Sequence, residues 1–497
     1  MTVLTPALDN CLYRADQVSQ LDQLAIAEQN IAGIDLMQAA GKAVWKLVTE
    51  TWPHARHILI VCGAGNNGGD GYIVAALARA AGKQVTVIAL QTPDSLKGDA
   101  LLAAHQFLQA SGKIATFNAD VLQQADVIVD AIFGIGLDRN VEGEYLAAIN
   151  AINHCAKPVL AVDVPSGLNA DTGKVMGAAV RAAVTLSFIA RKQGLYTGDA
   201  RDYCGNIKFS DLGVSQTILE KVMPSADLLQ LHSCDRLLPK RSRTAHKGHY
   251  GHLLVVGGDY VYAGAVRLCG ETAARSGAGL VSIATRPEHA VVIPSGRPEL
   301  MATGVSSVAD MTALLEQASV IAIGPGLGQS DWSAALLARV LDTRLPLVVD
   351  ADALNLLSRA PVRRDNWMLT PHPGEAARLL GTSVAEVESD RFAAASALQA
   401  KYGGVIVLKG SGTIIVDHAA RVSVCAAGNP GMASGGMGDV LTGLIAGLLC
   451  QHLATADAAR LGVCVHACAA DMNAQQNGER GMLATDLLPV IRQLLNS

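Results

Sequence analysis

A glycine-rich segment near the end of the chain has the residue types expected of a phosphate-binding turn. It runs from Gly428 to Asp439 with the sequence GNPGMASGGMGD, and a helical apolar pattern begins directly after it at Val440. Such a turn can point several backbone N–H groups at a phosphate, and the helix N-terminus adds positive potential. Asp439 would lie in the first helical turn, where a carboxylate can accept a proton from a hydroxyl that attacks phosphorus. An isolated aspartate there is more often a helix cap, but the density of glycines favours the catalytic interpretation.

Other segments of the second half place polar residues where apolar runs end. The turn from Lys409 to Thr413 lies between two apparent strands, so it is either a nucleotide-binding turn or a plain hairpin. The segments Gly324–Gly328 and Thr370–Glu375, and the residues Asp350, Asp352 and Asn355, each follow another such run. Ligands dock at the carboxyl ends of parallel strands. These segments therefore predict a nucleotide site.

A second glycine-rich turn lies in the first half of the chain. After the apolar run His57–Cys62 comes GAGNNGGDG, which ends at Gly71 and is followed by a helical pattern from Tyr72. The turn resembles a dinucleotide fingerprint without matching the GxGxxG spacing. A plain strand-to-helix turn does not need five glycines in nine residues, so we expect a ligand site.

Oxygen-bearing side chains at three strand ends of the first half predict a cation site. Asn67, Asp130 and Ser166 supply amide, carboxylate and hydroxyl oxygens, which suit a hard monovalent or divalent cation and exclude zinc. Asp130 by itself would more often be a cap or turn residue. The prediction therefore depends on the three strand ends converging.

The elements that must position these residues follow an alternating rhythm. With 497 residues, half of them hydrophobic and 17% charged, the chain suits α/β domains with buried parallel strands. Apolar β-rich runs alternate with helical patterns in both halves, which predicts βαβ units. The rhythm lapses between about residues 213 and 243, so we expect two doubly wound α/β domains, 1–215 and 216–497. The expected strands are His57–Cys62, Gln84–Leu90, Asp126–Ala131, Pro158–Asp163, Ala183–Phe188, His252–Gly257, Leu280–Thr285, Val320–Gly324, Leu345–Asp350, Asn366–Thr370, Val405–Lys409 and Gly412–Val416.

Composition makes several classes of partner improbable. A net charge of -5 and an aromatic content of 4% provide neither a broad basic face nor stacking platforms, so no nucleic acid is expected. No stretch reaches the roughly 18 uninterrupted apolar residues of a membrane span, and Val440–Leu449 is expected to be a buried helix. The segment Met1–Arg14 lacks the pattern of a secretory signal, which predicts a cytoplasmic protein.

A short basic run follows the expected domain boundary. It could gather polyphosphate, but a solvated linker face is the favoured interpretation. Its members are Arg236, Lys240, Arg241, Arg243 and Lys247.

The second half resembles a known family over residues 236–497. The segments LLVVGGDYVYAGA, GPGLG, VVDADALN, LTPHPGEAARL, VIVLKGSGT and GNPGMASGGMGDVLTG follow the order of the ribokinase-like dehydratase domain of bacterial NAD(P)H-hydrate repair enzymes. GPGLG or KGxxT alone is weak, whereas TPHPGE together with GGMGD is specific. The resemblance implies ADP-dependent dehydration of NADHX and NADPHX, the hydrated forms of the reduced cofactors, with Mg²⁺ accompanying the nucleotide.

The implied chemistry gives the motifs a role. A hydroxyl at C6 of the hydrated ring is a poor leaving group, and its phosphorylation by ADP gives AMP and a good one. Asp439 would deprotonate or orient that hydroxyl, and the N–H groups of Gly435 to Gly438 would stabilise the transferring phosphoryl group. The resemblance assigns contacts with the hydrate to Ala265, Gly326, His372 and Asp439, and contacts with the adenine nucleotide to Lys409, Gly410, Ser411, Gly412, Thr413 and Gly438. His372 could otherwise be a satisfied core histidine, but its flanking prolines and strand-end position favour a ligand role.

The first half resembles the epimerase domain of the same repair system over residues 10–213. The segments that carry the resemblance are LMQAAG, GAGNNGGDG, VDAIFGIG, AVDVPSGLNADTG and RKQGLYTG. It implies interconversion of the R and S hydrates and K⁺ bound by Asn67, Asp130 and Ser166. Asp163 is the candidate acid–base residue, with Lys192 as its partner unless this lysine is a surface charge. The implied substrate contacts are Asn66, Asn67, Gly68, Gly69, Asp70, Gly134, Ile135, Gly136, Leu137, Asp138, Arg139, Asn140 and Asp163.

The two resemblances together imply a bifunctional isomerase and lyase, with an N-terminal Rossmann-like domain and a C-terminal ribokinase-like domain. Its partners would be NADHX, NADPHX and ADP, and we expect a homo-oligomer. The competing hypothesis is a vitamin-type small-molecule kinase, because fold does not determine function. In that case the first domain would be a non-catalytic nucleotide-binding module.

Overall fold

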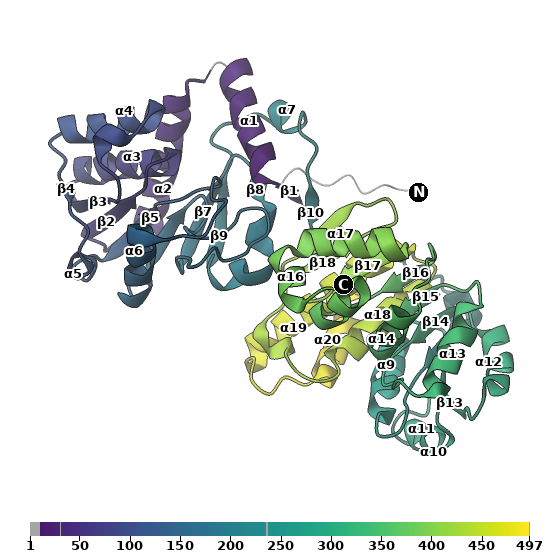
Figure 1. Ribbon diagram of the computed structural model, residues 1–497. Coiled ribbons are helices and arrows are strands. Elements are labelled where there is room, and N and C mark those ends of the chain that lie inside the picture. The colour runs from purple at the N-terminus through teal and green to yellow at the C-terminus, as the bar shows by residue number, and fades with distance from the viewer. Residues whose placement is uncertain (1–9, 30, 235–236, 497) are drawn as a thin grey trace. The chain divides into compact units, whose positions relative to one another are not determined.

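The computed structural model describes residues 10–29, 31–234 and 237–496, so residues 1–9 of the expected signal-free segment and Arg236 of the basic run lie outside it. The chain separates into two compact units, Met1–Asp227 (unit 1) and Leu228–Ser497 (unit 2) (Figure 1). The sequence placed the boundary between residues 215 and 216. The division falls later because α7 (Gln216–Leu219) contacts α1 (Ala15–Glu28), and the first residues of β10 (Ala226–Leu228) pair with β1 (Cys11–Tyr13).

Unit 1 is built around a seven-stranded sheet with the order β4-β3-β2-β5-β6-β7-β9. Every neighbouring pair in it is parallel. The strands are β2 (His57–Cys62), β3 (Gln84–Ala89), β4 (Ile114–Ala115), β5 (Val127–Ala131), β6 (Val159–Val162), β7 (Val184–Phe188) and β9 (Asn206–Ser210). A short strand, β8 (Arg191–Lys192), pairs with β1 outside this sheet.

Helices cover both faces of the unit 1 sheet. Ile58 and Ile60 share one core with α2, α3 and α4, whereas Leu59 and Val61 share another with α5 and α6. Alternate residues of a strand point to opposite faces, so this division makes unit 1 doubly wound, as the sequence predicts. The helices are α2 (Gly33–Thr51), α3 (Asn66–Ala80), α4 (Gly98–Gln109), α5 (Ala119–Leu122) and α6 (Gly143–His154).

Unit 2 contains a sheet with the order β13-β12-β11-β14-β15-β16-β17-β18-β19. The pairs from β13 to β17 are parallel, and β17, β18 and β19 form an antiparallel meander. The strands are β11 (His252–Val256), β12 (Leu280–Thr285), β13 (Met301–Gly304), β14 (Val320–Ile323), β15 (Leu347–Val349), β16 (Trp367–Leu369), β17 (Val405–Leu408), β18 (Thr413–Val416) and β19 (Val422–Cys425).

The principal core of unit 2 packs α9, α18, α19 and α20 against the sheet. A Cβ on Gly443 would overlap the carbonyl oxygen of Cys269, so the absence of a side chain lets α18 approach α9 closely. Among the described residues, no helix has the length and apolar character needed to cross a membrane. The helices are α8 (Leu231–Cys234), α9 (Ala263–Ser276), α10 (Pro287–Ala290), α11 (Val292–Gly296), α12 (Thr312–Gln317), α13 (Asp331–Leu341), α14 (Ala351–Arg359), α15 (Pro373–Leu380), α16 (Val384–Ser389), α17 (Arg391–Tyr402), α18 (Met437–Cys450), α19 (Thr455–Asn477) and α20 (Leu487–Leu494).

Candidate active sites

The GAGNNGGDG segment of unit 1 forms the turn between β2 and α3. A Cβ on Gly63 would overlap the carbonyl oxygen of Ile132, and one on Gly68 would overlap the carbonyl oxygen of Gly63. Glycine is therefore required where the backbone of this turn meets the end of β5. The close approach places Asn66 and Asn67, the first residues of α3, at the carboxyl edge of the sheet.

A cavity of about 490 Å³ opens at this edge, within the size range of small-molecule sites. Helices α1 and α2 supply much of its apolar wall, including Val18, Ile26, Leu36 and Met37. The predicted site residues that line it are Asn66, Asn67, Asp70, Gly134, Ile135, Gly136, Leu137, Asp163 and Lys192. The predicted contacts outside its lining are Gly68 and Gly69, which are buried in the first turn of α3, and Asp138, Arg139 and Asn140, which are exposed.

Asp163 and Lys192 form a buried ion pair in this cavity. Asp163 follows β6 with a φ of 65°, a left-handed conformation that is uncommon for a residue other than glycine and concentrates at functional sites. Its Oδ1 atom also accepts a hydrogen bond from the Phe188 N–H (3.0 Å), and the Lys192 Nζ atom donates to the Phe188 carbonyl (2.7 Å). The Lys192 side chain is 1% exposed. It is therefore not the surface charge that the sequence left as an alternative.

Asp70 lies beside this ion pair. Burial raises the pKa of Asp70 well above its ordinary value, the charges of Asp163 and Asp22 raise it further, and Lys192 opposes them. A carboxyl group in such an environment can stay protonated and donate a hydrogen bond. Asp22 and Asp99 also line the cavity, although the sequence did not indicate them, because each is a single acidic residue without a surrounding motif.

The three predicted cation ligands meet around the backbone of Phe133. Ser166 Oγ donates to Asp130 Oδ1 (2.6 Å), and the Phe133 N–H donates to Ser166 Oγ (2.8 Å). Asn67 Nδ2 donates to the Phe133 carbonyl (2.9 Å). Burial raises the pKa of Asp130 to about 6 against the hydrogen bonds from Ser166. These oxygens fit a hard cation, whose charge would offset the burial of the carboxylate.

In unit 2 the residue Asp350, at the end of β15, is the centre of a buried polar cluster. It accepts hydrogen bonds from Lys409 Nζ (2.6 Å), Thr370 Oγ1 (2.8 Å) and Thr442 Oγ1 (2.8 Å). Burial alone would raise the pKa of Asp350, but the charge of Lys409 and these hydrogen bonds lower it. An ionised Asp350 therefore fixes the Lys409 ammonium group at the carboxyl edge of the sheet.

The glycine-rich turn places the N-terminus of α18 beside Asp350 and Lys409. A Cβ on Gly438 would lie 3.5 Å from Lys409 Nζ and 3.6 Å from Asp350 Oδ2. Burial raises the pKa of Asp439 to about 7, the charge of Asp350 adds to the effect, and Lys409 opposes it. A carboxylate with a pKa near neutrality suits a general base.

The TPHPGE segment begins α15 beside this cluster. His372 caps the helix, since its Nδ1 atom accepts hydrogen bonds from the N–H groups of Gly374 (2.9 Å) and Glu375 (3.3 Å). Burial and the charge of Lys409 lower the pKa of His372, whereas burial raises that of Glu375 to about 7. The His372 side chain is 52% exposed, so it is a half-exposed cap and not a core histidine.

The remaining predicted residues of unit 2 lie in two turns. Lys409 to Thr413 join β17 to β18, so the hairpin that the sequence left open is present, and it presents Lys409 to Asp350. Gly326 lies against α9, where an added Cβ would be 3.1 Å from the Ala265 Cβ. The carbonyl of Gly326 also accepts a hydrogen bond from the Asp259 N–H (2.7 Å).

Several residues of this cluster were not assigned a role from the sequence. Thr370 was expected near the site only as the first residue of the segment Thr370–Glu375, without a role of its own, and Thr442 gave no signal because single threonines within a helix are common. His466 in α19 is buried, and its Nε2 atom has no hydrogen-bond partner in the described part of the chain. Burial and the charge of Lys409 lower the pKa of His466 to about 4. It is therefore a neutral side chain beneath the N-terminus of α18.

Two family models match the chain, one in each unit. Residues 33–194 match the model described as YjeF-related protein N-terminus, and residues 253–493 match the one described as NAD(P)H-hydrate dehydratase. The bifunctional NAD(P)H-hydrate repair enzyme Nnr of Coxiella burnetii is 50% identical over 485 residues, covering 98% of this chain and 99% of the relative. The enzyme of the same name from Escherichia coli is 44% identical over 493 residues, covering 99% and 95%.

A solved structure supports the fold of unit 2. The ADP/ATP-dependent NAD(P)H-hydrate dehydratase of Bacillus subtilis, co-crystallised with ATP/Mg²⁺, matches 54% of this chain and 96% of its own length. The TM-score is 0.50 and the sequence identity 32%. The prediction of a ribokinase-like second domain is thereby confirmed.

Proposed function

Because this chain belongs to the family of bifunctional NAD(P)H-hydrate repair enzymes, we propose that its two units divide the repair of NADHX and NADPHX between them. Unit 1 interconverts the R and S hydrates. Unit 2 dehydrates the S form at the expense of ADP, giving NADH or NADPH, AMP and phosphate. The observation that carries the second activity is the meeting of Asp439, Lys409 and the N-terminus of α18 at one edge of the sheet.

In unit 2, Asp439 accepts the proton of the C6 hydroxyl as that oxygen attacks the terminal phosphoryl group of ADP. The new O–P bond replaces the bond to the AMP oxygen, and AMP leaves. Lys409, held by Asp350, and the backbone N–H groups of Gly435 to Gly438 stabilise the charge that develops on the phosphoryl oxygens. The ring nitrogen then supplies the electron pair that expels phosphate from C6, and loss of a ring proton restores the dihydropyridine.

Mg²⁺ is the expected companion of the nucleotide, because it neutralises phosphate charge in phosphoryl transfer. Glu375 is the carboxylate of the cluster best able to hold it. Its Oε2 atom accepts one hydrogen bond, from the His372 N–H (2.8 Å), and lies 3.9 Å from Lys409 Nζ, whereas Asp350 accepts hydrogen bonds from three side chains. A carboxylate together with substrate phosphates is the usual ligand set of Mg²⁺ in such sites.

In unit 1, the hydroxyl at C6 leaves with help from the ring nitrogen and returns on the opposite face. Asp163 serves as the acid–base group for both steps, and the buried Lys192 holds it in place. Asn67, Asp130 and Ser166 would hold K⁺, which would supply a fixed positive charge where the start of α3, with Asn67, meets the segment after β5, with Gly134. The cavity lined by Asp163 and Lys192 supports this assignment.

The experiment that tests both activities starts from a mixture of R and S NADHX. Purified protein is incubated with the mixture and ADP, and the absorbance of the restored dihydropyridine is followed. We expect both epimers to be converted completely. Conversion that stops near the initial S fraction, apart from slow spontaneous exchange, contradicts the epimerase assignment. A stable phosphorylated product in place of NADH supports the kinase alternative.

A further inference from the structure

Unit 2 contains a second cavity, of about 770 Å³, that the repair reaction does not use. Its lining includes Ser276 and Gly277 at the end of α9 and Gln451 at the end of α18. The candidate active site lies instead at the N-termini of these helices. Because α9 has 14 residues and an α-helix rises 1.5 Å per residue, the two sites are about 20 Å apart.

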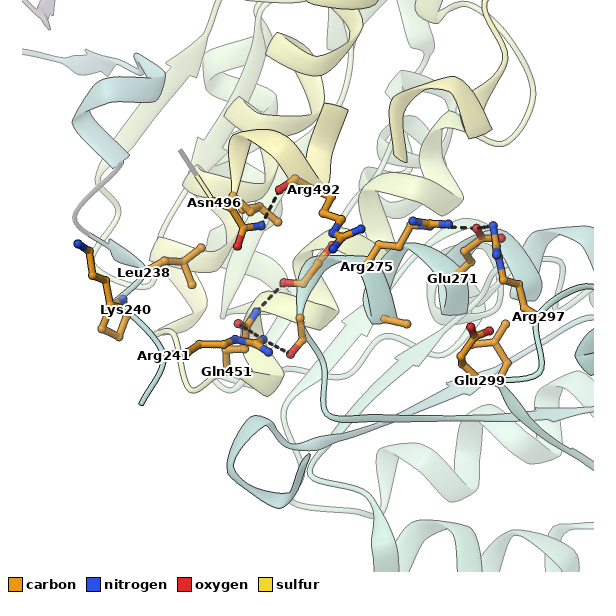
Figure 2. Close-up of a pocket in the computed structure, with 16 residues that line it drawn as sticks. Leu238, Lys240, Arg241, Glu271, Arg275, Arg297, Glu299, Gln451, Arg492 and Asn496 are labelled. Carbon is orange, nitrogen blue, oxygen red and sulfur yellow. Dashed lines mark hydrogen bonds and ion pairs between the residues drawn. The ribbon is translucent and has the colours of Figure 1, made fainter. Parts of the chain in front are cut away.

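The second cavity is strongly cationic (Figure 2). It brings together side chains from the segment after α8, from α9, from the segment after α11 and from α20. Five lining residues are cationic and two are carboxylates, which leaves a formal charge of +3. The cationic residues are Lys240, Arg241, Arg275, Arg297 and Arg492, and the carboxylates are Glu271 and Glu299.

The two central arginines have more donors than acceptors. Arg275 Nε (3.1 Å) and Arg297 Nη2 (2.5 Å) both contact the same oxygen, Oε1, of Glu271. The Nε–H of Arg297 is shielded from solvent and has no hydrogen-bond acceptor among the described residues. A guanidinium group carries five N–H donors arranged to match a phosphate. Because the two guanidinium groups share one carboxylate oxygen, their other N–H groups remain available to an anionic ligand.

Helix capping accounts for only part of this charge. The C-termini of α9, α18 and α20 border the cavity, and cations near helix C-termini offset the helix dipole. Arg241 does this directly, since its Nη2 atom donates to the Gly277 carbonyl (2.6 Å) and to Gln451 Oε1 (2.8 Å). Lys240 and Arg492 are exposed, and neither forms an ion pair within the described part of the chain. Their charges remain available to a ligand.

We propose that this cavity binds a small molecule that carries a pyrophosphate group. The paired guanidinium groups of Arg275 and Arg297 fit one phosphate, and the other cations of the lining, Lys240 and Arg492, add positive charge to the cavity. The volume exceeds that of pyrophosphate alone, and Leu238 and Leu300 supply apolar contacts for the rest of the molecule. Two residues of the basic run, Lys240 and Arg241, thus belong to a site and not merely to a solvated linker.

The test measures the binding of radiolabelled inorganic pyrophosphate to the full chain by equilibrium dialysis. Wild type is compared with the double variant K240Q/R492Q and with the control R339Q/R344Q, which removes the same charge from unit 2 outside the cavity. Any pyrophosphate bound at the nucleotide turn is common to the three proteins. We expect K240Q/R492Q to lose one class of sites, or to bind there at least tenfold more weakly, while the control matches wild type.

Two results would overturn the proposal. One is an isotherm for K240Q/R492Q that coincides with that of wild type. The other is equal competition by inorganic phosphate, which shows general anion binding; a pyrophosphate site should prefer the labelled ligand at least tenfold. Because Lys240 and Arg492 lie outside the candidate active site, the dehydratase activity of K240Q/R492Q should be unchanged, and this activity reports that the variant is folded. The proposal does not depend on the repair function.

Discussion

At the scale of single residues, the pKa of Asp439 sets the expected pH dependence of dehydration. Burial raises that pKa to about 7, so the basic form is lost as the pH falls below 7. We expect kcat to fall about tenfold per pH unit below this value and to level off above it. The change Asp439→Asn should lower kcat at least about 10²-fold at every pH. The measurement is the pH profile of kcat for NADHX dehydration.

Glu375 provides the control for this assignment, because burial also raises its pKa to about 7. If Asp439 is the base, Glu375→Gln weakens nucleotide or Mg²⁺ binding, but kcat of this variant still falls below pH 7. If kcat no longer fell below pH 7 in Glu375→Gln but still did so in Asp439→Asn, Glu375 would be the base.

Asp350 is expected to contribute to stability as well as to the site. The change Asp350→Asn leaves the Lys409 ammonium group without the carboxylate 2.6 Å away. Removing one partner of a buried ion pair costs about 3–5 kcal/mol, and chemical denaturation should show a loss of this size. Asp352→Asn is the control, since Asp352 is only partly buried and should cost much less. Equal losses for the two variants would contradict the role assigned to Asp350.

Asp130 allows a test of the cation site that does not depend on activity. Burial raises its pKa to about 6, above its unfolded value of about 3.9. The free energy of unfolding therefore falls as the pH rises from about 4 to 6 and Asp130 ionises in the folded protein. Bound K⁺ should restore this free energy. At pH 7.5 and tenfold above its Kd, K⁺ should add about 1.4 kcal/mol relative to tetramethylammonium. The gain should be smaller at pH 5 and absent in Asp130→Ala. A thermal midpoint that does not change with K⁺ would contradict the assignment of a cation site to Asp130.

At the scale of helices and strands, the sequence predicted the buried parts of both sheets closely. The predicted run His57–Cys62 is β2 itself, and Leu280–Thr285 is β12. It missed the short β4, whose two residues are half-exposed, and β19, which is largely buried. It also missed β9 and β13, whose residues are largely half-exposed or exposed. Their sequences, NIKFS and MATG, have too few apolar residues for the continuous pattern that reveals a buried strand. Expectations of strands were therefore reliable for the buried parallel strands, whereas the antiparallel strand β19 was missed although it is buried.

The candidate sites followed the same logic. Asn67, Asp130 and Ser166 could be identified because each follows or adjoins a buried strand, and parallel topology brings those ends together. Thr442 and Asp22 could not be identified from the sequence, because each lies within a helix. No local pattern shows which face of a helix lines a cavity. Sequence patterns identify strand-end chemistry better than chemistry that tertiary packing assembles.

The packing of α18 on α9 gives a prediction at this scale. A Cβ on Gly443 would overlap the carbonyl oxygen of Cys269, so Gly443→Ala should force the helices apart and displace the turn that ends at Asp439. Overpacking of this kind costs about 1–3 kcal/mol, measurable by chemical denaturation, and dehydration should slow in parallel. Gly264→Ala on α9 is the control, because an added Cβ there meets no atom within 4 Å. An unchanged Gly443→Ala variant would show that the close approach is not required.

At the scale of the whole molecule, the sequence predicted two α/β units with a boundary at 215/216, in the stretch from about 213 to 243 that lacks strand rhythm. The compact units divide at 227/228, inside the same stretch. The segment between lacks the strand rhythm, so only tertiary contacts could assign it. Its helix α7 and the strand β10 complete unit 1 through α1 and β1. Unit 1 is thus completed by contacts between the two ends of its sequence. Local sequence patterns cannot predict contacts between segments so far apart in the chain.

The division of labour between the units predicts complementation between variants. Asp163→Asn should convert only the S fraction of mixed NADHX at the full rate, because asparagine tolerates the left-handed backbone at this position while the ion pair with Lys192 is lost. Asp439→Asn should exchange the epimers but restore the dihydropyridine at least about 10²-fold more slowly. Mixing the two proteins should give complete conversion, because a released S hydrate diffuses to the intact unit 2 of the other variant. The matched control is Asp199→Asn, which removes a half-buried carboxylate of unit 1 that pairs with Lys174 and should convert both epimers unaided. If the mixture stopped at the S fraction although each variant kept its remaining activity, the two steps would have to occur within one chain.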